Sequence, residues 1–368
     1  MQIRKMEKAP RRVVVVETAF IGDVVFTSPL VHAIKEAYSE SEVYMLVRPY
    51  SVEVAACIPG VDKVLTFDKY GSESGPVGIL KAARRIRREK CDLLVSPHRS
   101  TRSALLARFS GVPLRVGHRQ GLGRLTYNVS VPPLPNQNCG LLQNLNLLAA
   151  VGIESCGTRL RLKGPADQDE YIEGFCNLNG IRPEDKMVAL CIGAFWPTKR
   201  WPAVYYASLG ESLTERGYQP VLFGGPNELG IATEIMKARA QPLASCLGNR
   251  LVESAALMAR CEMAVGGDSG LAHMARALGL PTVLIYGPTD PKAHRFEENS
   301  RVLTANVKCR PCSPHGPRRC PERHHDCMRM VSPENVLDAL REIADLQTPL
   351  PGHERHARER PDATPPPG

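Results

Sequence analysis

Three short segments of this 368-residue chain combine glycines and charged side chains in patterns that suit a phosphorylated ligand. The first is GGDSGLAH, residues 266–273, between an apolar strand pattern and an amphipathic helix pattern. Glycines let a backbone approach a ligand closely, and the free N–H groups and dipole of a helix start favour phosphate. We expect His273 to donate a hydrogen bond to that phosphate, and Asp268 to cap the helix or bind a sugar hydroxyl. A strand, turn and capped helix without a ligand would show the same pattern.

The second segment is WPTKRWP, residues 196–202, which predicts a rigid and cationic loop. Lys199 suits a diphosphate as a compact positive charge, whereas Trp201 and Pro202 begin the next helix. Further on, Glu228 follows the Gly224-Gly225 turn and could accept hydrogen bonds from a ribose or a base. An acid in the first turn of a helix is equally expected without any ligand.

The third segment is TAFIGD, residues 18–23, directly after the first strand pattern. Gly22 permits a tight turn, and Asp23 stands near a helix start, where a carboxylate can act as general base toward a hydroxyl group. Asp is also a common helix cap, so the residue type alone leaves both roles open.

A cysteine cluster lies near the end of the chain, at Cys309, Cys312, Cys320 and Cys327. Four thiolates in a Pro- and Arg-rich loop suit a tetrahedral structural Zn²⁺, although the spacing is not that of a standard zinc ribbon. An iron–sulfur cluster and disulfides are the alternatives, and a reducing compartment disfavours disulfides. The other eight cysteines are scattered singly through the chain and look like small buried hydrophobic residues.

The elements that must position these residues alternate between strands and helices in two successive blocks, as in βαβ units with parallel sheets. In the first block we expect strands at 12–17, 43–47, 63–67 and 93–96 and helices at 23–38, 78–89 and 141–150. In the second we expect strands at 188–191, 220–223, 263–265 and 282–286 and helices at 202–216, 228–238, 252–259 and 271–278.

The domain organisation predicted from these blocks is an α/β protein with two facing Rossmann-like domains, over residues 1–165 and 166–331. The second domain includes the Cys-rich loop 309–327, and the linker falls in the polar stretch 163–169. A final helix is expected over 332–346 and a disordered tail over 347–368. Ligands of such sheets bind at the carboxyl ends of the strands.

Positive charge is concentrated in the first domain. Of the net charge of +9, residues 1–165 contribute 24 lysines and arginines against 13 acids, whereas the rest of the chain is slightly acidic. This favours an anionic partner, such as a phosphorylated lipid, a membrane surface or a nucleic acid, unless it is only a solvated surface. No apolar run is long enough to cross a bilayer, and MQIRKMEKAPRR is not followed by the apolar core of a secretory signal. We therefore expect a cytoplasmic protein.

The segments GDVVFTSPLVHAIKEAY, WPTKRWP and GGDSGLAHMARALGLPTVLIYGPTDP together resemble the inverting heptosyltransferases of lipopolysaccharide core assembly. This family of nucleotide-sugar transferases has the GT-B fold, and the resemblance extends from residue 12 to about residue 345, nearest to the branch that adds the second heptose. It implies an N-terminal acceptor domain, a C-terminal donor domain and ADP-L-glycero-D-manno-heptose as the donor.

The resemblance also assigns roles to single positions. Asp23 matches the family's proposed catalytic base, and Lys199 matches the lysine at the donor phosphates. Donor-binding positions of the family fall on Lys199, Glu228, Asp268, Ser269, Gly270 and His273. The chain departs from the family at Gly267, where Asn commonly precedes the Asp.

The implied reaction is a single displacement in which Asp23 takes the proton of an acceptor hydroxyl as that oxygen attacks the anomeric carbon. The departing diphosphate is stabilised by Lys199, His273 and the helix start, so no divalent metal or other cofactor is required. The implied acceptor is an anionic lipid-linked core sugar at the inner face of the cytoplasmic membrane, to which the protein would be peripheral. Arg99 and Arg102, after a strand, are the first choices for acceptor contact.

Two alternatives stay open from the sequence. One is a GT-B transferase or an epimerase that uses another nucleotide sugar. The other is a metal- or nucleic-acid-binding module, although we expect no nucleic-acid partner because no aromatic stacking platform or nucleic-acid fold is visible.

Overall fold

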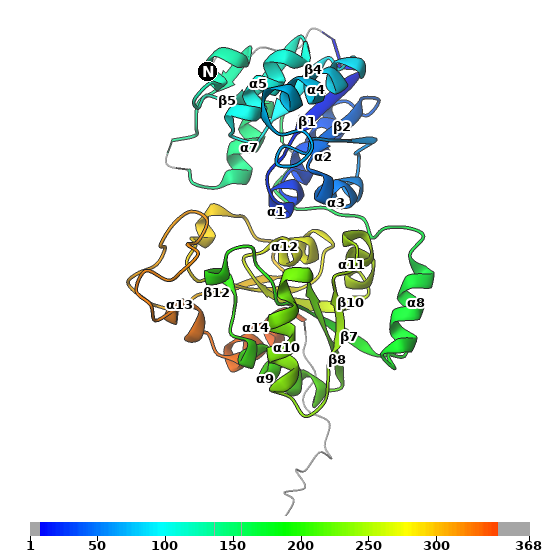
Figure 1. Cartoon of the computed structure of the whole chain (residues 1–368), viewed down its shortest axis with the longest axis vertical. Coiled ribbons are helices and arrows are strands. Elements are labelled where there is room, and N and C mark those ends of the chain that lie inside the picture. The colour runs from blue at the N-terminus through cyan, green and yellow to red at the C-terminus, as the bar shows by residue number, and fades with distance from the viewer. Residues whose placement is uncertain (1–7, 136, 156, 345–368) are drawn as a thin grey trace, which may run out of the picture.

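The computed structural model describes residues 8–135, 137–155 and 157–344, which form two α/β units placed end to end (Figure 1). The elements of the first unit are β1 (Arg12–Val16), α1 (Ile21–Val25), α2 (Ser28–Ala37), β2 (Glu42–Val47), α3 (Val52–Ala56), β3 (Lys63–Thr66), α4 (Gly75–Arg88), β4 (Leu93–Ser96), α5 (Thr101–Ser110), β5 (Leu114–His118), α6 (Gly123–Thr126), β6 (Val129–Val131) and α7 (Gly140–Ala149).

The second unit repeats this plan. Its elements are α8 (Asp169–Leu178), β7 (Lys186–Cys191), α9 (Ala203–Thr214), β8 (Tyr218–Gly224), α10 (Leu229–Lys237), β9 (Ala244–Leu247), α11 (Leu251–Met258), β10 (Cys261–Gly267), α12 (Gly270–Ala277), β11 (Thr282–Ile285), β12 (Ser300–Leu303), α13 (Asp326–Arg329) and α14 (Pro333–Ala344). Single 3₁₀ turns precede α3, α9, α10 and β12.

The two sheets have the same topology. Their strand orders are β3-β2-β1-β4-β5-β6 and β12-β11-β10-β7-β8-β9, and every pairing is parallel. This is the Rossmann order, in which the direction of the connections reverses between β1 and β4 and again between β7 and β10. Ligands of such sheets bind at these reversals, outside the carboxyl ends of the strands.

Alternate residues of β1 belong to different layers of the first unit. Val13 and Val15 pack with α1, α2, α3 and α7, whereas Val14 and Val16 pack with α4 and α5. A strand covered on both faces must be apolar at every position, which explains the uninterrupted run of valines.

Most predicted elements lie within a few residues of observed ones, but the predicted helix 23–38 is wrong as a single helix. It is two helices, α1 and α2, because Pro29 has no N–H to donate and its ring would clash with a carbonyl of the preceding turn. The hydroxyls of Thr27 and Ser28 satisfy the carbonyls of Val24 and Val25, at 2.6 and 2.8 Å. Nine further elements were not predicted from the sequence: β5, β6, β9, β12, α3, α5, α6, α8 and α13.

The predicted domain boundary at residue 165 falls between the last strand of one sheet, β6, and the first strand of the other, β7. The predicted final helix overlaps α14, and the predicted disordered tail over 347–368 lies outside the described residues.

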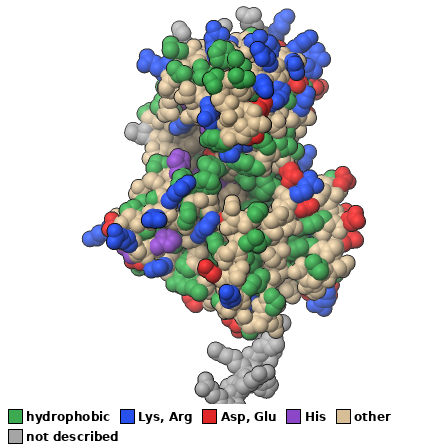
Figure 2. Space-filling model, viewed as in Figure 1, with side chains coloured by type: hydrophobic (Ala, Val, Ile, Leu, Met, Phe, Trp, Pro, Cys, Tyr) green, Lys and Arg blue, Asp and Glu red, His purple; other side chains and the backbone are tan. Residues whose placement is uncertain are grey.

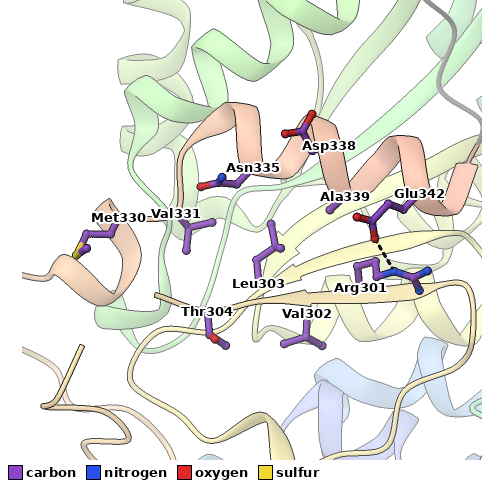
Figure 3. A pocket seen from close by; sticks show the side chains of 10 residues that line it. All are labelled: Arg301, Val302, Leu303, Thr304, Met330, Val331, Asn335, Asp338, Ala339 and Glu342. Carbon is purple, nitrogen blue, oxygen red and sulfur yellow. Dashed lines mark hydrogen bonds and ion pairs between the residues drawn. The ribbon is translucent and has the colours of Figure 1, made fainter. Parts of the chain in front are cut away.

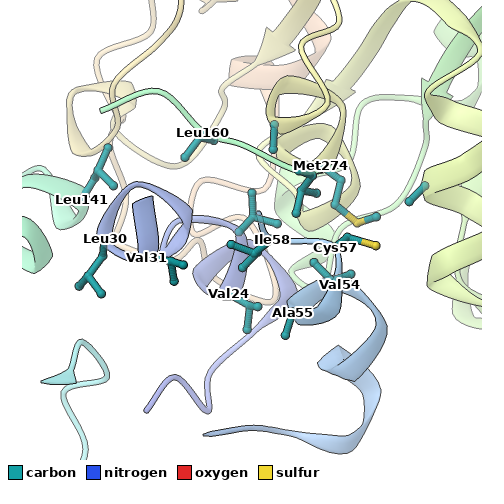
Figure 4. Packing of buried hydrophobic residues seen from close by; sticks show 14 of the residues in the cluster. Val24, Leu30, Val31, Val54, Ala55, Cys57, Ile58, Leu141, Leu160 and Met274 are labelled. Atoms are coloured by element: carbon teal, nitrogen blue, oxygen red, sulfur yellow. The ribbon is translucent and has the colours of Figure 1, made fainter. Parts of the chain in front are cut away.

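The two units meet through α1 and α12 (Figure 1). One hydrophobic cluster continues across the contact, where Met274 of α12 lies beside Ile58 and Cys57 (Figure 4). The connecting chain binds both units, because the N–H of Leu162 donates to the carbonyl of Ala277 at 2.7 Å and the N–H of Lys163 donates to that of Cys57 at 2.8 Å.

Candidate active site

The predicted site residues gather where the two sheets face each other. Asp23, Lys199 and Asp268 follow β1, β7 and β10, the inner strands at the two reversals of strand order. The surface is hollowed at this waist of the molecule (Figure 2). Two sheets therefore present their ligand-binding edges to one shared space, as the sequence predicted.

Two glycines, which have no side chain, allow the starts of α1 and α12 to come together. A Cβ atom on Gly270 would lie 3.1 Å from the Cβ of Ile21, and one on Gly22 would lie 3.4 Å from the Cδ2 of His273. Gly22 and Gly270 thus let α1 and α12 approach closely, and this contact places Asp23 beside the amino end of α12.

Asp23 is exposed and lies at the third position of α1. It does not cap the helix, since Phe20 is the N-cap residue, but its Oδ2 accepts the N–H of Phe20 at 3.0 Å. The protein around the waist displaces water from the carboxylate and raises the pKa of Asp23, while the hydrogen bond from Phe20 and nearby positive charges, including Lys199, oppose the shift. A fixed carboxylate with a raised pKa is a better proton acceptor than an ordinary one.

Asp268 is the centre of a buried network. Its Oδ2 accepts from the Nζ of Lys199 at 2.5 Å and from the hydroxyl of Thr289 at 2.9 Å, and its Oδ1 lies 3.1 Å from the Nε2 of His273. Burial alone would raise the pKa of Asp268, but the hydrogen bond from His273 and the charge of Lys199 outweigh it and hold the pKa well below its usual value. The side chain is therefore a permanent carboxylate.

His273 is buried, and both of its ring nitrogens have partners. The guanidinium of Arg276 can only donate, and its Nη1 lies 3.2 Å from the Nδ1 of His273, so Nδ1 is the acceptor and Nε2 carries the proton toward Asp268. Burial and the charge of Arg276 lower the pKa of His273 accordingly. In this arrangement His273 orients Asp268, and direct donation to a phosphate, as predicted, requires it to leave that carboxylate.

Asp268, His273 and His294 are the one group among the described residues whose potential metal ligands all lie within 4.8 Å of one another. A metal would need the lone pair of Nε2 on His273, but the donation from Arg276 to Nδ1 keeps the proton on Nε2. The ammonium of Lys199 already neutralises Asp268. The group is therefore arranged for hydrogen bonding rather than for holding a divalent cation.

The surroundings of Gly267 explain why this position has no side chain. A Cβ atom there would lie only 2.5 Å from the carbonyl oxygen of Lys199. The space that the side chain of the family's common Asn would need is filled here by the backbone that carries Lys199.

The helix start of α12 is capped by Ser269, not by Asp268. The Oγ of Ser269 accepts the N–H of Ala272 at 3.5 Å, and the residue has extended backbone angles typical of an N-cap. The amino end of α12 therefore lies directly beside Asp268 and faces α1 of the other unit.

Glu228 uses both carboxylate oxygens within the protein. Oε1 accepts from the Nη2 of Arg200 at 2.9 Å, and Oε2 accepts from the N–H of Gly225 at 2.9 Å. It stabilises the start of α10, and any contact with a nucleoside would use the remaining lone pairs.

The two predicted acceptor residues differ in their surroundings. Arg102 lies over the ring of Tyr70, 5.1 Å from its centroid, whereas Arg99 is exposed and forms no hydrogen bond or ion pair with any described residue. Both follow β4, next to the end of β1.

A cationic cluster around Tyr70 was missed from the sequence. Arg48 and Lys69 also lie against this ring, 4.8 and 5.1 Å from its centroid. Together with Arg102, three positive charges therefore surround Tyr70. Lys69 is buried, and burial together with the charge of Arg48 lowers its pKa to about 8. Like charges held together in this way favour an anion, and the loop between β3 and α4 carried no sequence signal for it.

Glu17 is a second missed residue. It is buried at the end of β1, and burial together with the charge of Asp23 raises its pKa to about 8. Its Oε1 accepts the N–H of Ala19 at 2.9 Å, which fixes the turn that leads to Asp23. A single acid after a strand has no distinguishing spacing in a sequence.

The cysteine loop packs beneath Lys199. The Nε2 of His325 lies 2.7 Å from the carbonyl of Thr198, and the N–H of Cys312 donates to the carbonyl of Pro288 at 2.8 Å. Burial and the charges of the other three clustered cysteines raise the pKa of Cys327 to about 11. The four thiols are thus neighbours, although no three of their sulfur atoms lie within 4.8 Å of one another in the described structure.

A separate hollow of about 460 Å³ lies between β12 and α14, where Arg301 pairs with Glu342 at 3.0 Å (Figure 3). None of the residues that line it is among the predicted site residues.

Comparisons with known proteins agree with this geometry. Residues 79–324 match the profile of glycosyltransferase family 9 (heptosyltransferase). Lipopolysaccharide heptosyltransferase 2 of Escherichia coli K12 is 27% identical over 349 residues, which cover 89% of this chain and 97% of that protein.

Two solved structures are similar over almost their full length. The family 9 glycosyltransferase from Veillonella parvula superposes with a TM-score of 0.81 at 23% identity and covers 92% of this chain and 99% of its own. The E. coli ADP-heptose lipopolysaccharide heptosyltransferase II gives a TM-score of 0.73 at 22% identity and covers 90% and 98%. The predicted α/β class and GT-B fold are confirmed.

Proposed function

Because this chain belongs to glycosyltransferase family 9, the heptosyltransferases, we propose that it transfers heptose from ADP-L-glycero-D-manno-heptose to the inner core of lipopolysaccharide. Its relatives are heptosyltransferases of lipopolysaccharide and lipooligosaccharide, which supports heptose as the sugar and lipopolysaccharide as the acceptor. The observation that carries the proposal is the contact between α1 and α12, which brings the exposed carboxylate of Asp23 next to the start of α12 and the ammonium of Lys199.

The acceptor half of the reaction belongs to Asp23. Its carboxylate takes the proton of the acceptor hydroxyl as that oxygen forms a bond to the anomeric carbon and the bond from that carbon to the diphosphate oxygen breaks. Attack from the face opposite the leaving group inverts the anomeric configuration. The hydrogen bond from Phe20 holds the carboxylate in place, and its raised pKa favours proton transfer.

The donor half of the reaction develops negative charge on the departing diphosphate. The N–H groups at the start of α12 and the ammonium of Lys199 are fixed before the reaction, so they need not reorganise as charge develops. Asp268 keeps Lys199 extended toward α12, and His273 and Thr289 keep Asp268 in place. These groups supply the stabilisation that a divalent cation provides elsewhere.

The acceptor is anionic, and the cationic cluster of Arg48, Lys69 and Arg102 suits its carboxylate or phosphate groups. Arg99 extends this positive surface at the end of β4. Transfer would take place at the cytoplasmic face of the membrane that holds the lipid-linked acceptor.

We also propose a structural Zn²⁺ at Cys309, Cys312, Cys320 and Cys327. Thiolates in one loop are a donor set that suits zinc, with Zn–S distances of about 2.3 Å. Binding would draw the sulfur atoms together and fix the loop under Lys199, with no part in the chemical step.

The experiment is a donor screen with the purified chain and a truncated lipopolysaccharide that lacks the outer core. Mass spectrometry of the acceptor should show the addition of one heptose from the ADP-linked donor, with inverted anomeric configuration by NMR. Transfer from UDP- or GDP-linked hexoses in place of ADP-heptose would contradict the donor assignment.

A further inference from the structure

The first unit exposes several large apolar side chains at its surface. They lie on α4, α5, α6 and the loops before them, at Tyr70, Val77, Leu80, Phe109, Leu122 and Leu125. Leu125 is 82% exposed and Val77 is 64% exposed. Because α5 packs against both α4 and α6, these side chains belong to one face, which we call the α4–α6 face. Water is an unfavourable environment for such a concentration of apolar groups.

The apolar side chains of this face are surrounded by unpaired cations. Residues 75–88 and 93–131 contain eleven lysines and arginines and no acid. Eight of them are exposed and form no ion pair with a described residue: Lys81, Arg84, Arg87, Arg88, Arg99, Arg108, Arg119 and Arg124. Lys and Arg side chains gather at the end of the molecule that carries α4 and α5, with hydrophobic side chains between them (Figure 2).

The pattern on α4 shows how the sequence builds this face. Its inward positions are Gly78, Ile79, Ala82, Ala83 and Ile86, which cover the sheet. The outward side has apolar residues near the amino end, at Val77 and Leu80, and cations toward the carboxyl end. Apolar residues beside long basic chains suit a bilayer surface, where the former enter the acyl boundary and the latter bind lipid phosphates.

The α4–α6 face also ends at the acceptor side of the waist. Both α5 and α6 start after the carboxyl ends of β4 and β5, and Tyr70 belongs to the cationic cluster with Arg48 and Arg102. A sugar attached to a lipid in the bilayer would therefore meet the cationic cluster before it reaches Asp23.

We propose that the α4–α6 face docks this protein on a bilayer that contains anionic phospholipids, with Leu122 and Leu125 entering the headgroup region. The purpose of docking rests on the proposed function, but the binding itself does not require transfer.

The test is sedimentation of the full chain with phosphatidylcholine vesicles, with and without phosphatidylglycerol. We expect binding at least about tenfold tighter to the anionic vesicles, weakened by added salt. The double variant Leu122→Ser, Leu125→Ser should lose most of this binding. Its matched control is Leu178→Ser, Leu229→Ser, which removes two exposed leucines from the second unit and should bind as the unchanged chain does.

The charge contribution is tested with Arg84→Ser, Arg88→Ser on α4. We expect about tenfold weaker binding, whereas Lys237→Ser, Arg260→Ser on the second unit should have no effect. Equal binding to both kinds of vesicle, or equal binding of the Leu122→Ser, Leu125→Ser variant and its control, would overturn the proposal. So would stronger binding to RNA than to anionic vesicles at the same salt.

Two transfer assays separate this proposal from the proposed function. The Leu122→Ser, Leu125→Ser variant should transfer normally to a deacylated, soluble acceptor and poorly to an acceptor embedded in vesicles. Normal vesicle binding without any heptose transfer would contradict the function and leave the docking surface standing. Normal transfer without vesicle binding would contradict the docking surface and leave the proposed function standing.

Discussion

Gly22 lies against the imidazole of His273, so close that a Cβ atom there would be 3.4 Å from the ring. This contact joins the turn after β1 to the helix after β10, and it is the point at which the two Rossmann-like sheets share one site. Phe26 reinforces it with ring centroids 4.7 Å from His273 and 4.8 Å from His294. The chemistry of both substrates therefore depends on how α1 and α12 meet.

Lys199→Ala should raise the KM for the donor and lower kcat, together by about 10²-fold in kcat/KM, because the charge facing the diphosphate is lost and Asp268 is left with less compensation. Lys199→Arg should recover little, since the planar guanidinium does not replace a compact ammonium 2.5 Å from a carboxylate. Steady-state kinetics check both variants. Lys237→Ala, on the outer helix α10, is the control, and equal losses in both alanine variants would remove Lys199 from the site.

Gly267→Ala should disturb donor binding without touching the donor. Its Cβ would meet the carbonyl of Lys199 at 2.5 Å, so the loop that carries Lys199 must shift. We expect about tenfold weaker donor binding by calorimetry and a loss of roughly 1–3 kcal/mol in stability. Gly230→Ala is the control, because its Cβ meets nothing within 4 Å in α10 and should stabilise the helix. A Gly267→Ala chain with normal donor affinity would show that the close approach is dispensable.

Glu17→Gln should stabilise the protein in a pH-dependent way. An unfolded glutamate ionises near pH 4.5, whereas folded Glu17 keeps its proton up to about pH 8. The free energy of unfolding of the unchanged chain therefore falls as the pH rises between these values. Gln has no such proton and can still accept the N–H of Ala19. We expect little change at about pH 5 and a stabilisation on the order of 3 kcal/mol at about pH 8.5.

Thermal denaturation at both pH values measures this effect, with the exposed Glu40→Gln as control. A stability difference between Glu17→Gln and the unchanged chain that does not grow as the pH rises would mean that Glu17 is already ionised in the fold.

The cysteine loop should hold about one Zn²⁺ per chain when the protein is purified without chelators. Cys309→Ser, Cys312→Ser should abolish the metal and weaken donor binding, because the same loop supports Thr198 beside Lys199. Cys176→Ser, away from the loop, is the control. Metal analysis that finds no zinc in the unchanged chain would contradict the structural role.

The fold was largely predictable because its strongest strands are buried on both faces and its glycine turns end them. The strands after β4 were missed for a physical reason: β5 (LRVGH) contains polar residues because it is near the sheet edge, and β6 has three residues. The division between α1 and α2 was encoded by Pro29 alone, which a helix tolerates in its first turn, so the pattern of apolar residues ran on across the break.

The site was predictable where a residue follows an inner strand, as Asp23, Lys199 and Asp268 do. It was not predictable where the role depends on contacts across the chain. Arg48, Lys69 and Tyr70 come from two loops and meet only because β2 and β3 are adjacent. The hydrogen bonds from Arg276 to His273 and from Arg200 to Glu228 likewise depend on distances in the fold, which the spacing of residues in the sequence does not reveal.

The central claim is that Asp23 accepts the proton of the acceptor while the donor is held by other residues. The most direct test is Asp23→Asn, measured for donor affinity by calorimetry and for heptose transfer by initial rates, with the exposed Glu40→Gln as control. We predict donor affinity within about threefold of the unchanged chain and a kcat lower by roughly 10²–10⁴-fold. A variant that keeps near-normal kcat, with the donor bound as before, would contradict the account.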